Sequence, residues 1–205
     1  MKKLKEINPI LDISEHLIPV DLPELFGNSG DCALEIGFGD GDFLSESAIR
    51  QPGKNFLGIE VKKRRFNKAV KTALRKGLGN IKFLHIDANV AVGEIFYPDS
   101  FSTVYINFPD PWPKDRHQKH RIINAEFLEK LSRVMKRNAK LDIASDHKDY
   151  IFNALARLNN ITFFESEYRG SGYLNHVPER PLTTYEREFR EEGRKIYYLM
   201  FTNNK

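Results

Sequence analysis

Short apolar runs alternate with longer amphipathic stretches along this chain, and this alternation restricts its fold more than any other feature. The apolar runs have the length of buried β-strands, and the stretches between them have helical periodicity. We predict strands at residues 32–36, 55–61, 81–86, 102–108, 140–145, 161–168 and 196–202. Helices are predicted at residues 42–50, 62–76, 124–136, 148–158 and 184–192. This order predicts an α/β fold made of βα units, with right-handed crossovers and a mostly parallel sheet.

The 205 residues suffice for one domain, and 40% apolar with 29% charged residues argue against disorder. We expect an N-terminal arm at residues 1–30 and a single domain at 31–205. Cys32 is the only cysteine, which excludes an intrachain disulfide, and no cluster has the spacing of a zinc site. No segment approaches the roughly 20 apolar residues of a membrane span. We therefore predict a cytoplasmic protein without a metal, a membrane association or an obligatory protein partner, either monomeric or homodimeric.

The positive charge of the chain is clustered. The net charge is only +4, but lysines and arginines gather at residues 62–65, 114–121 and 133–140. Clusters of this kind indicate a polyanionic partner. The cluster at 62–65 has two interpretations: it is the solvated start of a helix, or it contacts an RNA backbone.

A glycine-rich turn follows the first predicted strand. Gly37 and Gly39 permit a left-handed backbone and a close approach of a ligand, although a G-x-G pattern alone is not specific. Glu35 lies inside the strand, where its carboxylate is placed to accept a hydrogen bond from an ammonium group. Asp40 and Asp42 put negative charge at the start of the next helix, where a pyrophosphate would otherwise bind. The turn therefore favours a cofactor with an amino group and a positive charge over a dinucleotide.

Further polar side chains follow the next two predicted strands. Glu60 lies about 20 residues beyond the turn, at the position of the acidic residue that binds ribose hydroxyls in adenosine cofactors. Asp87 and Asn89 follow the third strand and are placed to accept from an adenine amino group. Each acid alone is more often a helix cap or a solvated residue at a strand end than a ligand contact. Together, in this order at successive strand ends, they predict S-adenosylmethionine as the cofactor.

A stiff loop follows the fourth predicted strand. Pro109, Pro111 and Pro113 fix the backbone and remove donors over five residues. The loop also carries Asp110 and Trp112, and it leads into a cationic stretch made of Lys114, Arg116, His117, Lys119, His120 and Arg121. Ligands of open α/β sheets bind outside the carboxyl ends of the strands. We therefore predict a pocket for a flat base beside a set of phosphate contacts.

Two later motifs allow a structural and a functional interpretation. Asp146 follows the fifth predicted strand and either caps the next helix or belongs to the site. Thr183 and Glu186 have the spacing of a capping box, which explains them without any ligand.

These motifs together resemble the bacterial-type tRNA (guanine-N7)-methyltransferases over nearly the whole chain, most specifically at residues 107–121 and 183–189. The resemblance implies a Rossmann-like class I methyltransferase fold: a mostly parallel seven-stranded sheet with helices on both faces and an antiparallel last strand. It implies that S-adenosylmethionine is held by Glu35, Glu60, Asp87 and Asp110, with Gly37, Gly39 and Asn89 nearby. It implies a tRNA substrate bound by Lys114, Arg116, His117, Arg121, Asp146, Thr183, Thr184, Tyr185 and Glu186. One departure is His120, which stands where relatives often have arginine and is mostly neutral at pH 7.

The implied reaction is transfer of a methyl group to N7 of a guanine in the tRNA variable loop. N7 carries a lone pair and no proton, so no general base is needed. Asp110 and Asp146 are the candidate catalytic residues, either beside the charge that develops on the purine or on its Watson–Crick edge. Three alternatives stay open: methylation of an exocyclic amine, an RNA-binding domain that has lost its chemistry, and a regulatory subunit.

Overall fold

Seven strands form one sheet in the order β3-β2-β1-β4-β5-β7-β6 in the computed structural model, which describes residues 7–112, 120–168 and 170–205. The strands are β1 (Cys32–Ile36), β2 (Asn55–Ile59), β3 (Ile81–Leu84), β4 (Phe101–Asn107), β5 (Met135–Ser145), β6 (Phe164–Ser166) and β7 (Tyr197–Asn203). Strands β1 to β5 pair in parallel, and β7 runs antiparallel to both of its neighbours. The predicted seven-stranded, mostly parallel sheet with an antiparallel last strand is confirmed.

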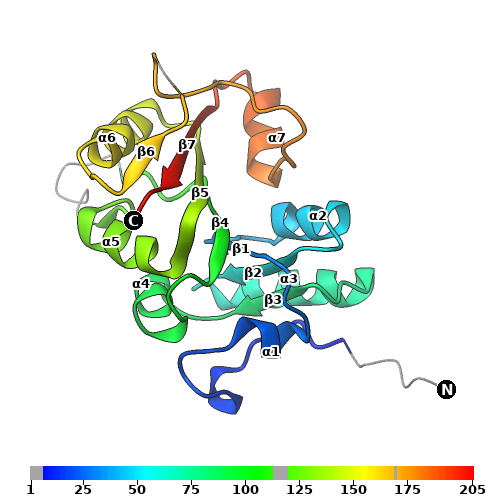
Figure 1. The fold of residues 1–205 in the computed structure, drawn as a ribbon. Helices are drawn as coiled ribbons and strands as arrows, with labels where there is room; N and C mark the ends of the chain where they lie inside the picture. Colours follow the sequence, from blue (N-terminus) through cyan, green and yellow to red (C-terminus); the bar gives the residue numbers. More distant parts are fainter. Residues whose placement is uncertain (1–6, 113–119, 169) are drawn as a thin grey trace.

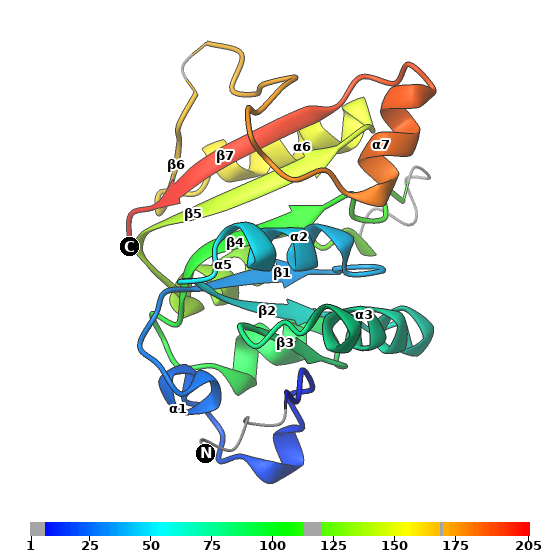
Figure 2. The ribbon, with the colours of Figure 1, turned by 90° about the vertical axis from the view of Figure 1, so that its right-hand side faces the viewer.

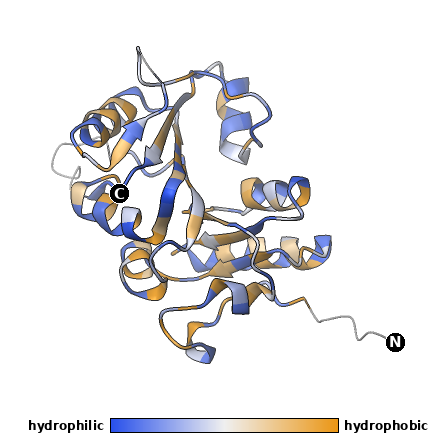
Figure 3. Cartoon of the chain, in the orientation of Figure 1, coloured by the Kyte–Doolittle hydropathy of each residue, from blue (hydrophilic) through white to orange (hydrophobic). Residues whose placement is uncertain are grey.

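Helices cover both faces of the sheet, as predicted (Figure 1). One face carries α2 (Asp42–Arg50), α3 (Lys63–Lys76) and α7 (Thr184–Glu191). The other carries α4 (Ala88–Val90), the π-helical turn η2 (Ala91–Ile95), α5 (Ala125–Val134) and α6 (Lys148–Asn159). Hydrophobic and hydrophilic residues alternate around these helices (Figure 3), and α2, α3, α5 and α6 turn an apolar side to the sheet, whereas the buried residue of α7 is Glu186. No helix in the described ranges is long and apolar enough to span a bilayer.

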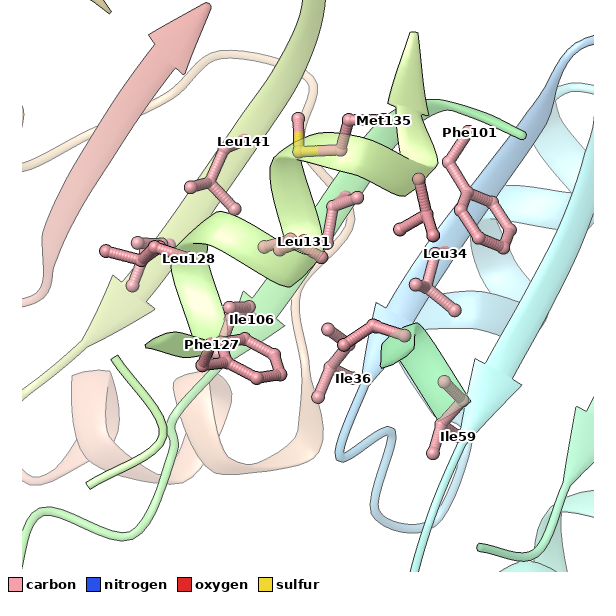
Figure 4. Close-up of a cluster of buried hydrophobic side chains, with 14 of the residues drawn as sticks. Leu34, Ile36, Ile59, Phe101, Ile106, Phe127, Leu128, Leu131, Met135 and Leu141 are labelled. Atoms are coloured by element: carbon pink, nitrogen blue, oxygen red, sulfur yellow. The ribbon is translucent and has the colours of Figure 1, made fainter. Parts of the chain in front are cut away.

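The two faces of the sheet have separate cores because side chains alternate along each strand. In β1, Leu34 and Ile36 pack with the α5 side, whereas Ala33 packs with α2 and α3. Figure 4 shows the larger core, in which Phe127 and Leu131 of α5 lie over the sheet. The strands read as continuous apolar runs because both faces are buried.

Residues 7–30 lie against the lower part of the sheet and contain η1 (Ile13–Glu15) and α1 (Leu22–Phe26), neither of which was predicted. Phe83 of β3 donates its N–H to Pro9 O (2.7 Å) and accepts from Leu11 N–H (2.9 Å). Leu11 and Val20 are buried in the larger core. Residues 7–30 thus cover the free edge of β3, and the division of the chain into an arm and a domain stays a prediction.

Element boundaries differ from prediction mainly around β5. The helix predicted at 124–136 ends at Val134, and the strand predicted at 140–145 begins already at Met135. Met135 pairs with Phe101, and the register then shifts before regular pairing with β4 resumes at Lys140. Three of the four intervening residues, Lys136, Arg137 and Asn138 (φ 63°), are polar, and the segment carries no alternating pattern. The strand predicted at 161–168 is limited to Phe164–Ser166.

Gly58 of β2 allows a close contact with the loop that follows β1. A Cβ atom on Gly58 would lie 2.5 Å from Phe38 Cδ1 and 2.9 Å from Leu44 Cδ2. We expect Gly58→Ala to lower the free energy of unfolding by about 1–3 kcal/mol through overpacking, as measured by urea denaturation. Gly53→Ala is the matched control, because a Cβ there meets no atom within 4 Å. Equal stability of the two variants would contradict this account.

Candidate functional site

A cavity of about 730 Å³ opens at the carboxyl ends of β1 to β4, within the usual size of a small-molecule site. Figure 2 shows this end of the sheet beside α7 and the start of α3. The predicted site residues that line the cavity are Glu35, Gly37, Gly39, Glu60, Asp87, Asn89, Asp110, Arg121, Thr183, Thr184 and Tyr185. Asp146 and Glu186 are not among the lining residues. Lys114, Arg116 and His117 lie outside the described residues.

A hydrogen bond joins the glycine turn after β1 to Glu60, the residue that follows β2. Gly37 and Gly39 have left-handed backbones, with φ of 71° and 58°, and favour glycine for that reason. Glu60 is buried and accepts from Gly39 N–H with Oε2 (3.0 Å) and from Lys62 N–H with Oε1 (2.8 Å). Glu60 therefore sets the shape of the turn and also presents negative charge to the cavity.

Glu35 is a buried carboxylate with one oxygen held and one oxygen available. Asn107 Nδ2 donates to Glu35 Oε1 (2.7 Å), whereas Oε2 has no hydrogen-bond partner within the described part of the chain. Burial raises the pKa of Glu35 to about 7, although the hydrogen bond from Asn107 acts to lower it. A cationic donor in the cavity would satisfy Oε2 and keep the carboxylate ionised.

Arg180 holds Asn107 in place and was not predicted as part of the site. Its side chain is 4% exposed and binds Asp142 in a bidentate pair, with both N–O distances at 3.1 Å. Arg180 Nη2 also donates to Asn107 Oδ1, and Nη1 lies 3.4 Å from Glu186 Oε2. Burial acts to lower the pKa of Arg180, but the carboxylates of Asp142 and Glu186 raise it above its ordinary value.

Glu186 belongs to this buried network. It is fully buried and accepts from Arg190 Nε (3.1 Å) and from Tyr198 OH. Its position argues for a role in holding α7 on the sheet, in place of the direct substrate contact that we predicted. Thr183 caps α7 by accepting from Glu186 N–H (2.9 Å), which agrees with the structural interpretation of this motif.

Thr184 and Tyr185 join α7 to the two helices beside the cavity. Thr184 Oγ1 donates to Asp42 of α2, and Tyr185 OH accepts from Arg65 of α3. The Arg65 guanidinium also lies 5.3 Å from the centre of the Tyr185 ring. The first turn of α7 therefore forms one wall of the cavity.

The loop after β4 forms the opposite wall and has a constrained backbone. Phe108 and Trp112 have left-handed backbones, with φ of 48° and 41°, which cost energy for large side chains. Arg121 is 5% exposed and donates to Pro111 O (2.8 Å) and Trp112 O (3.3 Å). These bonds occupy part of its guanidinium, so they support a loop-holding role over the predicted phosphate contact.

The remaining predicted residues occupy separate positions. Asp87 Oδ1 accepts from Asn89 N–H (2.8 Å) and Val90 N–H (3.4 Å), so Asp87 caps α4 at the cavity edge. Asp110 is exposed at the cavity. Asp146 accepts from Arg194 Nη1 (2.9 Å), and the cap of α6 is His147. Within the described ranges, no group of three or more His, Cys, Asp or Glu side chains is arranged to hold a metal ion.

Residues 29–199 match the model of a family described as putative methyltransferases. The chain is 36% identical to a tRNA (guanine-N(7)-)-methyltransferase of Thermotoga maritima over 89% of its length, and it spans 57% of that relative. It is 35% identical to the protein of the same name from Buchnera aphidicola, with 93% of this chain and 80% of the relative covered.

Solved structures share the fold at low sequence identity. An antibiotic-related methyltransferase superposes with a TM-score of 0.67 at 18% identity, covering 95% of both chains. The 16S rRNA methyltransferase KamB superposes with a TM-score of 0.66 at 15% identity, covering 89% of this chain and 92% of that one. These likenesses establish the class I methyltransferase fold and nothing about the substrate.

Removal of Arg180 is expected to destabilise the protein strongly. Arg180→Met leaves Asp142 and Glu186 without their buried cation, which typically costs about 3–5 kcal/mol in free energy of unfolding. Arg190→Met is the matched control, because Arg190 binds the same Glu186 from a side chain that is 35% exposed. We expect the control to lose about 1 kcal/mol or less in urea denaturation. Similar losses in the two variants would contradict the central role of Arg180.

Proposed function

This chain belongs to the tRNA (guanine-N(7)-)-methyltransferase family, and we propose that it transfers a methyl group from S-adenosylmethionine to N7 of a guanine in the variable loop of tRNA. The observation that carries the proposal is the row of acidic residues in the cavity. Glu35, Glu60, Asp87 and Asp110 stand at or just beyond the ends of successive strands, in the order that the family resemblance requires.

The residues present fit S-adenosylmethionine. The unpartnered, buried Oε2 of Glu35 calls for a cationic donor, and the amino-acid end of the cofactor carries an ammonium group. Glu60 is placed for the ribose hydroxyls, and Asp87 with Asn89 for the adenine edge. Asp40 and Asp42 keep the start of α2 negative, which disfavours a phosphate-bearing cofactor there.

The bound cofactor supplies an electrophilic methyl group on its sulfonium. The protein's part is to align guanine N7 with that methyl group, since N7 needs no deprotonation. Asp110, exposed in the cavity, is the proposed carboxylate beside the purine as it becomes cationic. Asp146 stays a proposed substrate contact; its side chain is 20% exposed and ion-paired with Arg194.

The proposed partner is tRNA in the cytoplasm, bound by a monomer or a homodimer. Thr183, Thr184 and Tyr185 supply polar contacts to the base from one wall of the cavity. Lys114, Arg116 and His117 are proposed phosphate contacts on sequence grounds alone.

The reaction is tested by incubating the protein with tritiated S-adenosylmethionine and unmodified tRNA transcript, followed by digestion to nucleosides and chromatography. The proposal requires label in N7-methylguanosine. Label in a nucleoside methylated on an exocyclic amine would overturn the N7 assignment. Absence of label from every nucleoside, with intact cofactor binding, would instead favour a lost activity or a missing partner.

The raised pKa of Glu35 gives cofactor binding a specific pH dependence. The carboxyl is half protonated near pH 7 in the free protein, and protonation removes the negative charge that attracts the ammonium group. Affinity for S-adenosylmethionine, measured by calorimetry, should therefore fall roughly tenfold between pH 7.5 and pH 6. Glu35→Gln is expected to bind more weakly at pH 7.5 and to lose this dependence. The same slope in both proteins would assign the titration to another group.

Asp110 and Asp146 are expected to differ in their effect on the chemical step. Asp110→Asn should lower the single-turnover rate at saturating tRNA by about 100-fold or more, as removal of a transition-state electrostatic contact does. Asp146→Asn should lower it by less than about tenfold, because Asp146 lies outside the cavity lining. A larger loss in the Asp146 variant, with both proteins folded, would exchange the two roles.

A further inference from the structure

Helix α3 carries positive charge on one side and no negative charge at all. Residues 62–77 contain eight lysines or arginines and no aspartate or glutamate. The buried side of α3 is formed by Phe66, Ala69, Val70 and Ala73. The charged side chains therefore project from the opposite side of the helix, away from the sheet.

Four of these cations form a stripe along α3. Arg64, Lys68, Lys71 and Arg75 have the spacing i, i+4, i+7 and i+11, which puts them on one face of an α-helix, opposite the buried side. All four residues are exposed. At a rise of about 1.5 Å per residue, the stripe is about 16 Å long, enough to follow several successive phosphates.

The stripe differs from an ordinary solvated helix face. In α2 and α5, by contrast, cations pair with acids of the same helix at i and i+4: Glu46–Arg50 in α2, and Glu126–Lys130 and Glu129–Arg133 in α5. Among the described residues, the single ion pair formed by α3 joins Lys68 to Asp40, and the Lys68 side chain is 60% exposed. The positive potential along this face is therefore largely uncompensated.

The stripe is continuous with the cavity. Arg64 lines the cavity at the start of α3, and Lys62 and Arg65 line it beside Arg64. Arg65 binds Tyr185 in the wall formed by α7, so the first turn of α3 is fixed relative to the base-binding side of the site. If a nucleic-acid strand places one base in the cavity, the backbone next to that base would pass over Arg64 at the start of α3.

We propose that the α3 stripe binds the phosphate backbone of the tRNA nucleotides next to the methylated guanine, an inference that rests on the proposed function. The contacts are with phosphates alone, so they add affinity and orientation without sequence preference. The stripe is formed by residues 64–75 and contains none of the residues of the cationic stretch at 114–121. A phosphate-binding role explains why residues 62–77, next to the cavity, carry eight lysines or arginines and no acidic residue.

The test compares two variants with equal loss of charge. Lys71→Gln/Arg75→Gln removes the part of the stripe that lies outside the cavity. Lys136→Gln/Arg137→Gln is the control: these residues belong to the basic cluster at 133–140, but they lie at the start of β5, at the opposite end of the sheet from the cavity, so no contact between them and the nucleotides next to the methylated guanine is expected. Affinity for a labelled tRNA transcript is measured by fluorescence anisotropy at several KCl concentrations.

The stripe variant should bind tRNA about tenfold more weakly near 0.15 M salt, and the slope of log K against log [KCl] should become shallower by about 1.4 to 1.8, since each of the two lost phosphate contacts contributes about 0.7–0.9. Its affinity for S-adenosylmethionine and its single-turnover rate at saturating tRNA should equal those of the wild type. The control should keep the wild-type slope.

An unchanged slope in the stripe variant, or equal changes in both variants, overturns the inference. Failure of the proposed function is distinguished by the nucleoside analysis of the wild type: a product other than N7-methylguanosine overturns that function, while the salt slopes still decide whether α3 binds RNA. Loss of the single-turnover rate in the stripe variant would also overturn the inference, because it would place Lys71 and Arg75 in the chemistry of the cavity.

Discussion

The site depends on the contacts that the buried guanidinium of Arg180 makes with three different parts of the fold. It joins the end of β4 through Asn107, the middle of β5 through Asp142, and α7 through Glu186. A cation at 4% exposure is tolerated only because two carboxylates and an amide surround it. Asn107, fixed in this way, orients Glu35. One side chain thus sets both the orientation of Glu35 in the cavity and the position of α7 at the cavity wall.

The parallel sheet explains why so many acids meet in one cavity. Each parallel strand of βα units ends at the same edge, so a polar residue placed after each of several strands is delivered to a common site. Two of these acids also accept hydrogen bonds from backbone N–H groups: Glu60 from the glycine turn, and Asp87 from the start of α4. The proposed binding residues Glu60 and Asp87 therefore also fix the local backbone, which favours a site that is formed before a ligand binds.

The sequence predicted which acidic residues follow the strands and line the cavity, but it did not predict the buried contacts that hold them in place. The bounds of β1 and α2 and the cavity positions of Glu35, Glu60, Asp87 and Asp110 follow from local signals: apolar runs, glycines and strand-end acids. The burial of Arg180 follows from contacts with residues far along the chain, such as Asp142, and no local pattern encodes it. The start of β5 was missed because residues 136–139 carry no alternating pattern, whereas Met135 pairs with Phe101 of β4 before the register shifts.

The cover over the β3 edge has a consequence for self-association. An exposed strand edge is a template on which another chain can add a strand, and long sheets are open to it at both ends. Here Pro9 and Leu11 occupy the backbone groups of Phe83 on one outer strand, and the other outer strand, β6, has only three residues. Over the ranges that the structure describes, neither outer strand of the sheet offers a long row of unpaired backbone groups, which disfavours edge-to-edge aggregation. The carboxyl ends of the strands stay open at the cavity.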